Sequence, residues 1–269
     1  LRGADVYCED GFIRAIGRGI DSKADITVDG SHMLCYPGLV NTHHHLYQQF
    51  SRNLPEVQGF ELFDWLRYLY DIWKNIDEEL ITLSSLTGMG ELMKNGCTTC
   101  FDHHYVFPRD GGDLIAAQFE AAGLIGMRMH ASRGSMDLSK KDGGLPPDSV
   151  VQTIDEIMKD SVRLIEKYHD PSKGSMRQIA LAPCSPFSVS GELLRESAAL
   201  ATQYGVRLHT HLCETKDEES YTLERYGMRP YAYMESLGWT GPDVWYAHGI
   251  HFNSDELKAL ADTGTGVAH

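Results

Sequence analysis

The chain has 269 residues, of which 42% are hydrophobic and 23% charged, and these proportions are those of a folded globular protein. Its formal net charge of −14 argues against a nucleic-acid partner, because binding to phosphates depends on Lys and Arg. No run of residues is long and apolar enough to cross a bilayer, so we expect no membrane partner. The six scattered cysteines do not form a disulfide framework. We therefore expect a cytoplasmic protein that binds a small molecule.

The first 36 residues contain three short apolar runs separated by turn residues. The runs cover 4–7, 12–16 and 26–28, and glycines punctuate them as they do in hairpins. We predict a small β module over 1–36, which precedes a main domain over 37–269.

From residue 37 onward, short apolar runs alternate with segments of helical periodicity. The runs lie at 39–42, 98–101, 125–129, 179–182, 206–208, 244–247 and 266–268. One helix is expected over 151–168, capped by Asp148 or Ser149, and another over 191–204, ended by Gly205. Such repeated alternation predicts an α/β protein with parallel strands and crossover helices.

A doubly wound sheet and a closed barrel both fit this alternation. Polar clusters directly follow the apolar runs, at the carboxyl ends of the expected strands, and in a barrel those ends meet at one mouth. A doubly wound sheet would carry a glycine-rich phosphate loop after its first strand, and the sequence shows none. We therefore predict a (β/α)8 TIM-like barrel. The chain supplies seven apolar runs, begins without Met and ends on an apolar run, so we expect an eighth strand beyond His269.

Three consecutive histidines, His43 to His45, follow the first apolar run of the barrel. Alternate residues of a strand point to the same side, so His43 and His45 share one side and His44 faces the other. Two imidazoles at this spacing suit one divalent ion, either zinc or iron. The alternative is a polar turn in which the histidines have no common role, and three histidines in a row favour the metal.

A second cluster follows the fifth run, where His211 could bind the same ion and Glu214 could carry a proton. A divalent ion lowers the pKa of bound water, and a neighbouring glutamate can take the released proton. The alternative for Glu214 is an acidic cap, because a helix is expected to begin at 216–219. His248 follows the next run and by alternation faces the mouth. Alone it would be interpreted as a buried core histidine, but beside the other clusters it indicates help with proton transfer.

These motifs, 37–45, 209–214 and 247–249, resemble the amidohydrolase superfamily, specifically its branch of deaminases and aminohydrolases. The resemblance runs through the whole chain and implies a barrel with a small β-sandwich built from both terminal segments. It implies one divalent metal ion, zinc or iron, held by His43, His45, His211 and an aspartate after the eighth strand. Glu214 and His248 match the proton-shuttling positions of the family. The resemblance also implies a homo-oligomer.

Three further segments, 133–136, 143–148 and 182–187, resemble the 8-oxoguanine deaminases and the relatives that act on hydroxylated triazines. Many deaminases carry histidine where Cys184 stands, and this difference favours the 8-oxoguanine branch. The implied reaction converts 8-oxoguanine to urate and ammonia. Guanine deamination and hydroxyatrazine aminohydrolysis remain alternatives. A non-catalytic scaffold is a further alternative, although such a protein would normally have lost its metal ligands.

Four residues are expected to bind the substrate. Arg133, at the base of a long loop, could donate to a ring carbonyl; a solvated arginine fits the sequence equally, and the resemblance favours the contact. Cys184 and Gln49 are assigned as polar contacts. Trp65 could stack on a purine, although its apolar neighbours also fit the core face of a helix.

Overall fold

The computed structural model describes residues 2–269, and the chain divides into two compact units. One unit consists of Leu1–Gly38 with Ser172–Gly174, and the other of Leu39–Pro171 with Ser175–His269. Among the described residues, no helix is both long and apolar enough to cross a membrane.

The first unit contains an antiparallel hairpin in which β1 (Asp5–Glu9) pairs with β2 (Phe12–Gly17). The two connecting residues, Asp10 and Gly11, have φ of 53° and 79°, the left-handed conformation that a two-residue hairpin turn requires. The strand predicted over 26–28 is wrong. Its apolar side chains are largely exposed, and no strand of the described chain pairs with it, so its backbone lacks the partner that a strand needs. The β-sandwich stays a prediction.

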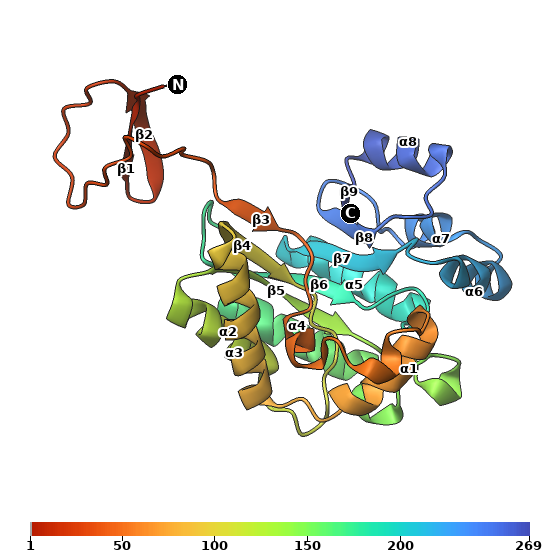
Figure 1. The fold of residues 1–269 in the computed structure, drawn as a ribbon. Helices are drawn as coiled ribbons and strands as arrows, with labels where there is room; N and C mark the ends of the chain where they lie inside the picture. The colour runs from red at the N-terminus through yellow and green to blue at the C-terminus, as the bar shows by residue number, and fades with distance from the viewer. Residues whose placement is uncertain (1) are drawn as a thin grey trace. The chain divides into compact units, whose positions relative to one another are not determined.

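The second unit is built on a sheet of seven parallel strands in the order β3-β4-β5-β6-β7-β8-β9 (Figure 1). Strands that are neighbours in space are also consecutive along the chain, as they are in a β/α barrel. The strands are β3 (Leu39–Asn41), β4 (Cys97–Asp102), β5 (Arg128–Ser135), β6 (Arg177–Pro183), β7 (Arg207–Leu212), β8 (Val244–His248) and β9 (Gly266–Ala268). The predicted parallel barrel architecture is confirmed over these seven strands.

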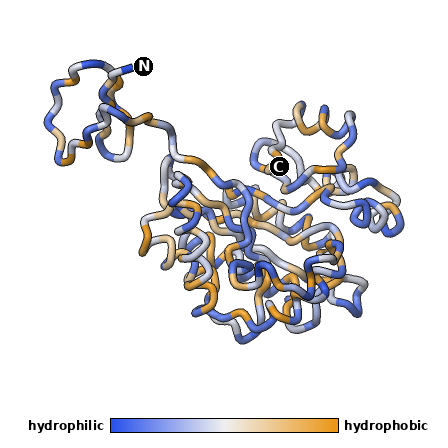
Figure 2. Tube along the Cα trace, viewed as in Figure 1, coloured by the Kyte–Doolittle hydropathy of each residue, from blue (hydrophilic) through white to orange (hydrophobic). Residues whose placement is uncertain are grey.

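Helices connect the strands. They are α1 (Leu62–Trp73), α2 (Glu78–Lys94), α3 (Leu114–Ile125), α4 (Ile154–Tyr168), α5 (Gly191–Tyr204), α6 (Lys216–Tyr226), α7 (Pro230–Ser236) and α8 (Ser254–Thr263). Helix α2 packs on β4, α3 on β5, α4 on β5 and β6, and α5 on β6 and β7, and these four helices pack on one face of the sheet. The helices show the expected mixture of apolar and polar residues along their length (Figure 2).

The start of α4 and the start of β5 differ from the prediction for local reasons. Helix α4 is capped by Thr153, not by Asp148 or Ser149, because the Thr153 hydroxyl accepts from the Glu156 N–H while the Glu156 carboxylate accepts from the Thr153 N–H. Helix α3 extends through Ile125 and ends at Gly126 with φ of 74°, so β5 begins only at Arg128.

The two faces of the sheet carry different side chains. Ile179 and Leu181 of β6 join the large core beneath the helices, whereas Ala180 and Ala182 belong to a small separate cluster with Phe101. This alternation assigns the small cluster to the face opposite the helices. On that inner face His209 lies against Phe101 and Trp245, with ring centroids 4.8 and 4.5 Å apart. Further histidines, His43, His45, His103 and His211, lie at or near the carboxyl ends of the strands.

Candidate active site

Four imidazoles converge at the carboxyl ends of β3, β4 and β7. His43, His45, His103 and His211 each offer one ring nitrogen, and these four atoms lie within 4.8 Å of one another. His43 and His45 follow β3, His103 follows β4, and His211 lies in β7. The structure therefore brings together the three histidines predicted as ligands and adds a fourth, His103. The alternation seen in His43 and His45 was readable from the sequence, whereas the approach of His103 depends on how β4 pairs with its neighbours.

Backbone carbonyls determine which nitrogen of each ring carries the proton. The His45 Nδ1 lies 2.8 Å from the His103 carbonyl oxygen, and the His211 Nδ1 lies 2.7 Å from that of Cys184. A carbonyl oxygen only accepts hydrogen bonds, so both Nδ1 atoms must be the protonated donors. The Nε2 atom of each ring is consequently left with an unprotonated lone pair.

A relay through His209 imposes the same state on His43. The Nδ1 of His209 donates to the Trp245 carbonyl oxygen at 2.9 Å, so its Nε2 must be an acceptor. The His43 Nδ1, 2.9 Å from that Nε2, is therefore the donor. This leaves the His43 Nε2 with a lone pair, and it is buried without a hydrogen-bond partner. A histidine ligand whose other nitrogen is held by a carbonyl or a further acceptor is the usual arrangement at a metal site.

The spacing of these lone pairs fits a metal ion. The Nε2 atoms of His45 and His211 face each other at 3.1 Å, although both rings carry their proton on the opposite nitrogen. Two nitrogens bound to one tetrahedral zinc at about 2.0–2.1 Å would lie about 3.3 Å apart. Burial lowers the pKa of His45 to about 3 and lowers the pKa of His43 and of His211 well below the ordinary value, so all three rings are neutral near pH 7. Neutral imidazoles with converging lone pairs are the donor set that a divalent cation requires.

An acid stands beside this cluster. The Glu214 carboxylate approaches the His248 Nε2 at 3.6 Å, and the His248 ring stacks on His211 with centroids 5.3 Å apart. Burial raises the pKa of Glu214 to about 7, which leaves the group able both to take and to give a proton near neutral pH. The helix cap expected as the alternative for Glu214 is not its role, because α6 begins only at Lys216 after Thr215.

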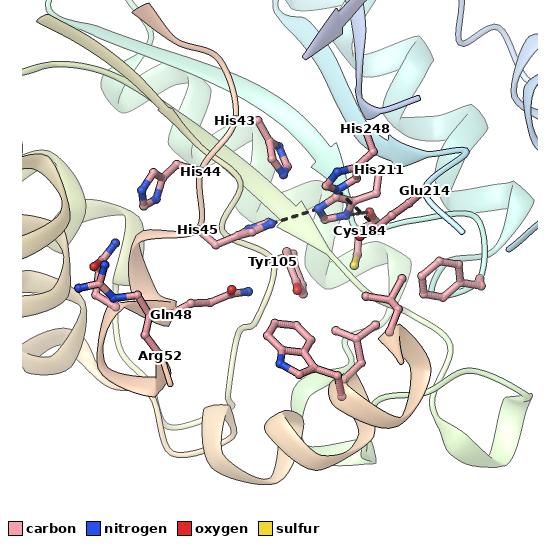
Figure 3. Close-up of a pocket in the computed structure, with 15 residues that line it drawn as sticks. His43, His44, His45, Gln48, Arg52, Tyr105, Cys184, His211, Glu214 and His248 are labelled. Carbon is pink, nitrogen blue, oxygen red and sulfur yellow. Dashed lines mark hydrogen bonds and ion pairs between the residues drawn. The ribbon is translucent and has the colours of Figure 1, made fainter. Parts of the chain in front are cut away.

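A pocket of about 410 Å³ opens onto these groups (Figure 3). His43, His45, His211, Glu214 and His248 all contribute to its lining. The remaining wall has two parts: an apolar one from α1 and the segment after β6, with Leu62, Trp65, Leu66 and Phe187, and a polar one from the segment after β3, with His44, Gln48, Gln49 and Arg52. A volume in this range suits a small organic ligand.

The residues predicted to contact the substrate differ in how they lie relative to the pocket. Cys184 and Trp65 line it, and burial raises the pKa of the Cys184 thiol to about 12, so this group stays protonated. Gln49 borders the pocket, but its carboxamide packs beside Gly88 of α2. The preceding Gln48 instead points into the cavity (Figure 3). These glutamines lie in a 3-10 helix, Leu46–Ser51, whose side-chain directions the sequence pattern did not predict.

Arg133 is not available to a ligand in the pocket. Its side chain is buried, and its guanidinium lies 4.0 Å from the centre of the Phe107 ring. The Nε donates a hydrogen bond to the Asp160 carboxylate at 2.7 Å, and the Nη2 donates one to the Gln152 side-chain oxygen at 2.8 Å. The expected substrate contact is therefore corrected. The physical reason is parity, because Arg133 shares the strand face of Met129 and Ala131, which pack into the core beneath the helices. Arg52 and Tyr105, which the sequence did not single out, line the pocket instead.

Parallel strands in consecutive order, with a metal-competent histidine cluster and a buried acid at their carboxyl ends, define the class of β/α-barrel proteins with a metal centre at the barrel mouth. Residues 34–269 match the amidohydrolase family, and the chain belongs to that family.

Individual relatives agree with this assignment. The chain is 48% identical to the 8-oxoguanine deaminase of Pseudomonas aeruginosa over 90% of its length, and 40% identical to hydroxydechloroatrazine ethylaminohydrolase of Pseudomonas sp. strain ADP over its whole length. The atrazine chlorohydrolase of Arthrobacter aurescens TC1, solved in complex with zinc, superposes with a TM-score of 0.88 at 31% identity over 99% of the chain. The chain spans 54%, 58% and 60% of these proteins respectively, which is a little over half of their length.

Proposed function

We propose that this protein is a metal-dependent hydrolytic deaminase of an aminopurine, with 8-oxoguanine as its substrate and urate and ammonia as its products. The observation that carries the proposal is the convergence of three neutral histidine nitrogens beside the buried acid Glu214. The 48% identity to an 8-oxoguanine deaminase supports the choice of substrate. We further propose a cytoplasmic location and assembly into a homo-oligomer.

In this proposal His43, His45 and His211 hold one zinc ion, and an aspartate outside this chain completes the set. The ion would supply the activation of water that hydrolysis of a C–N bond needs. His103 belongs to the same cluster and stacks on His211, with ring centroids 4.5 Å apart. Its Nε2 donates to the Ala182 carbonyl oxygen at 2.9 Å, so its Nδ1 keeps a lone pair that is buried without a hydrogen-bond partner and could serve the same ion.

Glu214 moves the protons of the reaction. It takes a proton from the water that attacks the ring carbon bearing the amino group and delivers it to the adjacent ring nitrogen. His248, 3.6 Å from the Glu214 carboxylate, orients that carboxylate during the transfer. Glu214 then carries the proton of the added hydroxyl to the amino group, the bond from the ring carbon to that group breaks, ammonia leaves, and the ring carbon keeps the oxygen as a carbonyl.

The pocket residues bind and orient the flat ring. Trp65 and the neighbouring apolar wall offer a surface for its faces, and Gln48 and Cys184 offer polar atoms to its edge.

The decisive experiment follows the conversion of 8-oxoguanine to urate by ultraviolet absorbance, with guanine and a hydroxylated aminotriazine in parallel. We expect turnover of 8-oxoguanine above that of the other two compounds, and a loss of at least about 100-fold in kcat for Glu214→Gln. Release of ammonia from the triazine alone would replace the substrate and keep the mechanism. A complete gene product that holds metal but releases no ammonia from any of these rings would refute the proposal in favour of a non-catalytic scaffold.

A further inference from the structure

The turn that carries Glu214 has an unusual backbone conformation. Cys213, the residue immediately before Glu214, has φ of 54°, in the left-handed region that residues other than glycine rarely adopt. Such a conformation persists only where surrounding contacts determine it. The direction in which the chain leaves β7, and hence the position of the Glu214 carboxylate, depends on what holds this turn.

One buried carboxylate supplies those contacts. Glu218, in the first turn of α6, is completely buried. Its Oε1 accepts a hydrogen bond from the Cys213 N–H at 2.8 Å, and its Oε2 accepts one from the Glu214 N–H at 3.0 Å. The two oxygens of a single side chain therefore bind two consecutive N–H groups, which fixes the orientation of the peptide plane between Cys213 and Glu214.

The opposite side of the same turn is joined to the turn that carries His248. The Cys213 carbonyl oxygen accepts from the His251 N–H at 2.9 Å, and the Leu212 carbonyl oxygen accepts from the Gly249 N–H at 3.0 Å. His248 itself has φ of 75°, so both turns are left-handed at or next to their functional residue. Glu218 thus lies on one side of a pair of linked turns whose side chains meet at 3.6 Å.

We propose that Glu218 is a positioning residue for Glu214. By holding the two N–H groups of the turn it keeps the Glu214 carboxylate beside His248 and the histidine cluster, without itself lining the pocket. The inference rests on the proposed function, because it assigns Glu218 the task of placing the group that moves the protons.

The first test compares Glu218→Gln with Asp217→Asn in the complete gene product. Glutamine keeps the length of the side chain but presents an NH2 group to one of the two N–H donors, whereas Asp217 is an exposed acid in the same helical turn and serves as the matched control. We expect kcat of Glu218→Gln to fall by about 10- to 100-fold, because a displacement of about 1 Å at a reacting group has effects of that size. KM, metal content and helical circular dichroism should stay at their wild-type values. Asp217→Asn should match the wild type throughout, and a Glu218→Gln variant with full kcat would overturn the inference.

The second test asks whether Glu218 acts through Glu214. In a Glu214→Gln background, adding Glu218→Gln should cost no further activity, and multiplicative losses would refute the positioning role. A crystal structure of Glu218→Gln should show Cys213 out of the left-handed region. Loss of metal or of helix content in both Glu218→Gln and Glu218→Asp would instead make Glu218 a purely structural residue and overturn the inference. Full activity of Glu214→Gln would defeat the proposed function, whereas an inactive Glu214→Gln beside a fully active Glu218→Gln defeats the inference alone.

Discussion

At Gly134 of β5 the backbone packs closely against the backbone of His104 and Tyr105, the segment that carries one wall of the pocket. A Cβ atom added there would lie 2.7 Å from the Tyr105 Cα and would also collide with the His104 carbonyl oxygen. That oxygen accepts a hydrogen bond from the Gly134 N–H at 2.9 Å, and Tyr105 lines the pocket. Because the obstacle is backbone, no rotamer change can relieve the collision, and we expect Gly134→Ala to lower the free energy of unfolding by about 3 kcal/mol.

The same substitution of glycine by alanine at Gly90 serves as the control. Gly90 lies inside α2 and has no atom within 4 Å of an added Cβ, so Gly90→Ala should stabilise the protein by about 0.5–1 kcal/mol through helix propensity. In urea denaturation the midpoint should fall by about 1 M for Gly134→Ala and rise slightly for Gly90→Ala. Equal midpoints for the two variants would refute the argument that the strand spacing at Gly134 excludes a side chain.

Three further predictions concern the site and the charged groups around it. Dialysis against a chelator should lower the Tm measured by differential scanning fluorimetry by several degrees, and added zinc should restore it. The reason is that a ligand at 100 times its Kd adds about 2.7 kcal/mol to the free energy of unfolding. The variant His43→Ala should show no such shift. The ratio kcat/KM should rise with pH as Glu214 loses its proton. The rise should be centred at or below pH 7, because burial raises the pKa of Glu214 to about 7 and a cation in the pocket would lower this pKa. A flat pH profile would contradict the role of Glu214 as a base. Arg133→Met should lower the free energy of unfolding by about 2 kcal/mol in chemical denaturation, because it removes the hydrogen bonds of a buried guanidinium to Asp160 and Gln152, while Asp160 keeps its ion pair with Arg163. KM should not change, because Arg133 does not line the pocket.

The sequence predicted the architecture because the signal for it repeats along the chain. Apolar runs followed by polar clusters mark the starts of six of the seven parallel strands to within two residues, and the order of the strands follows from their order in sequence. The exceptions are local. The signature of a capping box, Thr153 with Glu156 three residues later, stands in the sequence and identifies the start of α4. The run at 26–28 failed because a strand is defined by its partner, which no property of the run itself can supply.

Arg133 and the pair Gln48 and Gln49 show two limits on predicting pocket residues from the sequence. Strand alternation alone places Arg133 on the opposite side of β5 from His130. The His130 ring lies against Phe101 on the inner face, so the odd-numbered residues of β5 face the helices. The choice of Gln48 over Gln49 was not within reach of the sequence. In a 3-10 helix of six residues the side-chain directions depend on packing against α2, and Gln49 turns toward Gly88 because only hydrogen stands there.

Which ring nitrogen of each histidine carries the proton depends on the fold more than on the sequence motif. The proton positions on His45, His211 and His209 are set by the carbonyl oxygens of His103, Cys184 and Trp245, which belong to neighbouring strands or the segments that follow them. A pair of histidines two residues apart has no preferred tautomer in an unfolded chain. Strand pairing places an acceptor behind each ring, which leaves the lone pairs facing inward and makes the binding of a cation the arrangement that satisfies them. The capacity to bind a metal is therefore a consequence of strand pairing, and a mutation that shifts the register of β6 or β8 should abolish metal binding even with every histidine in place.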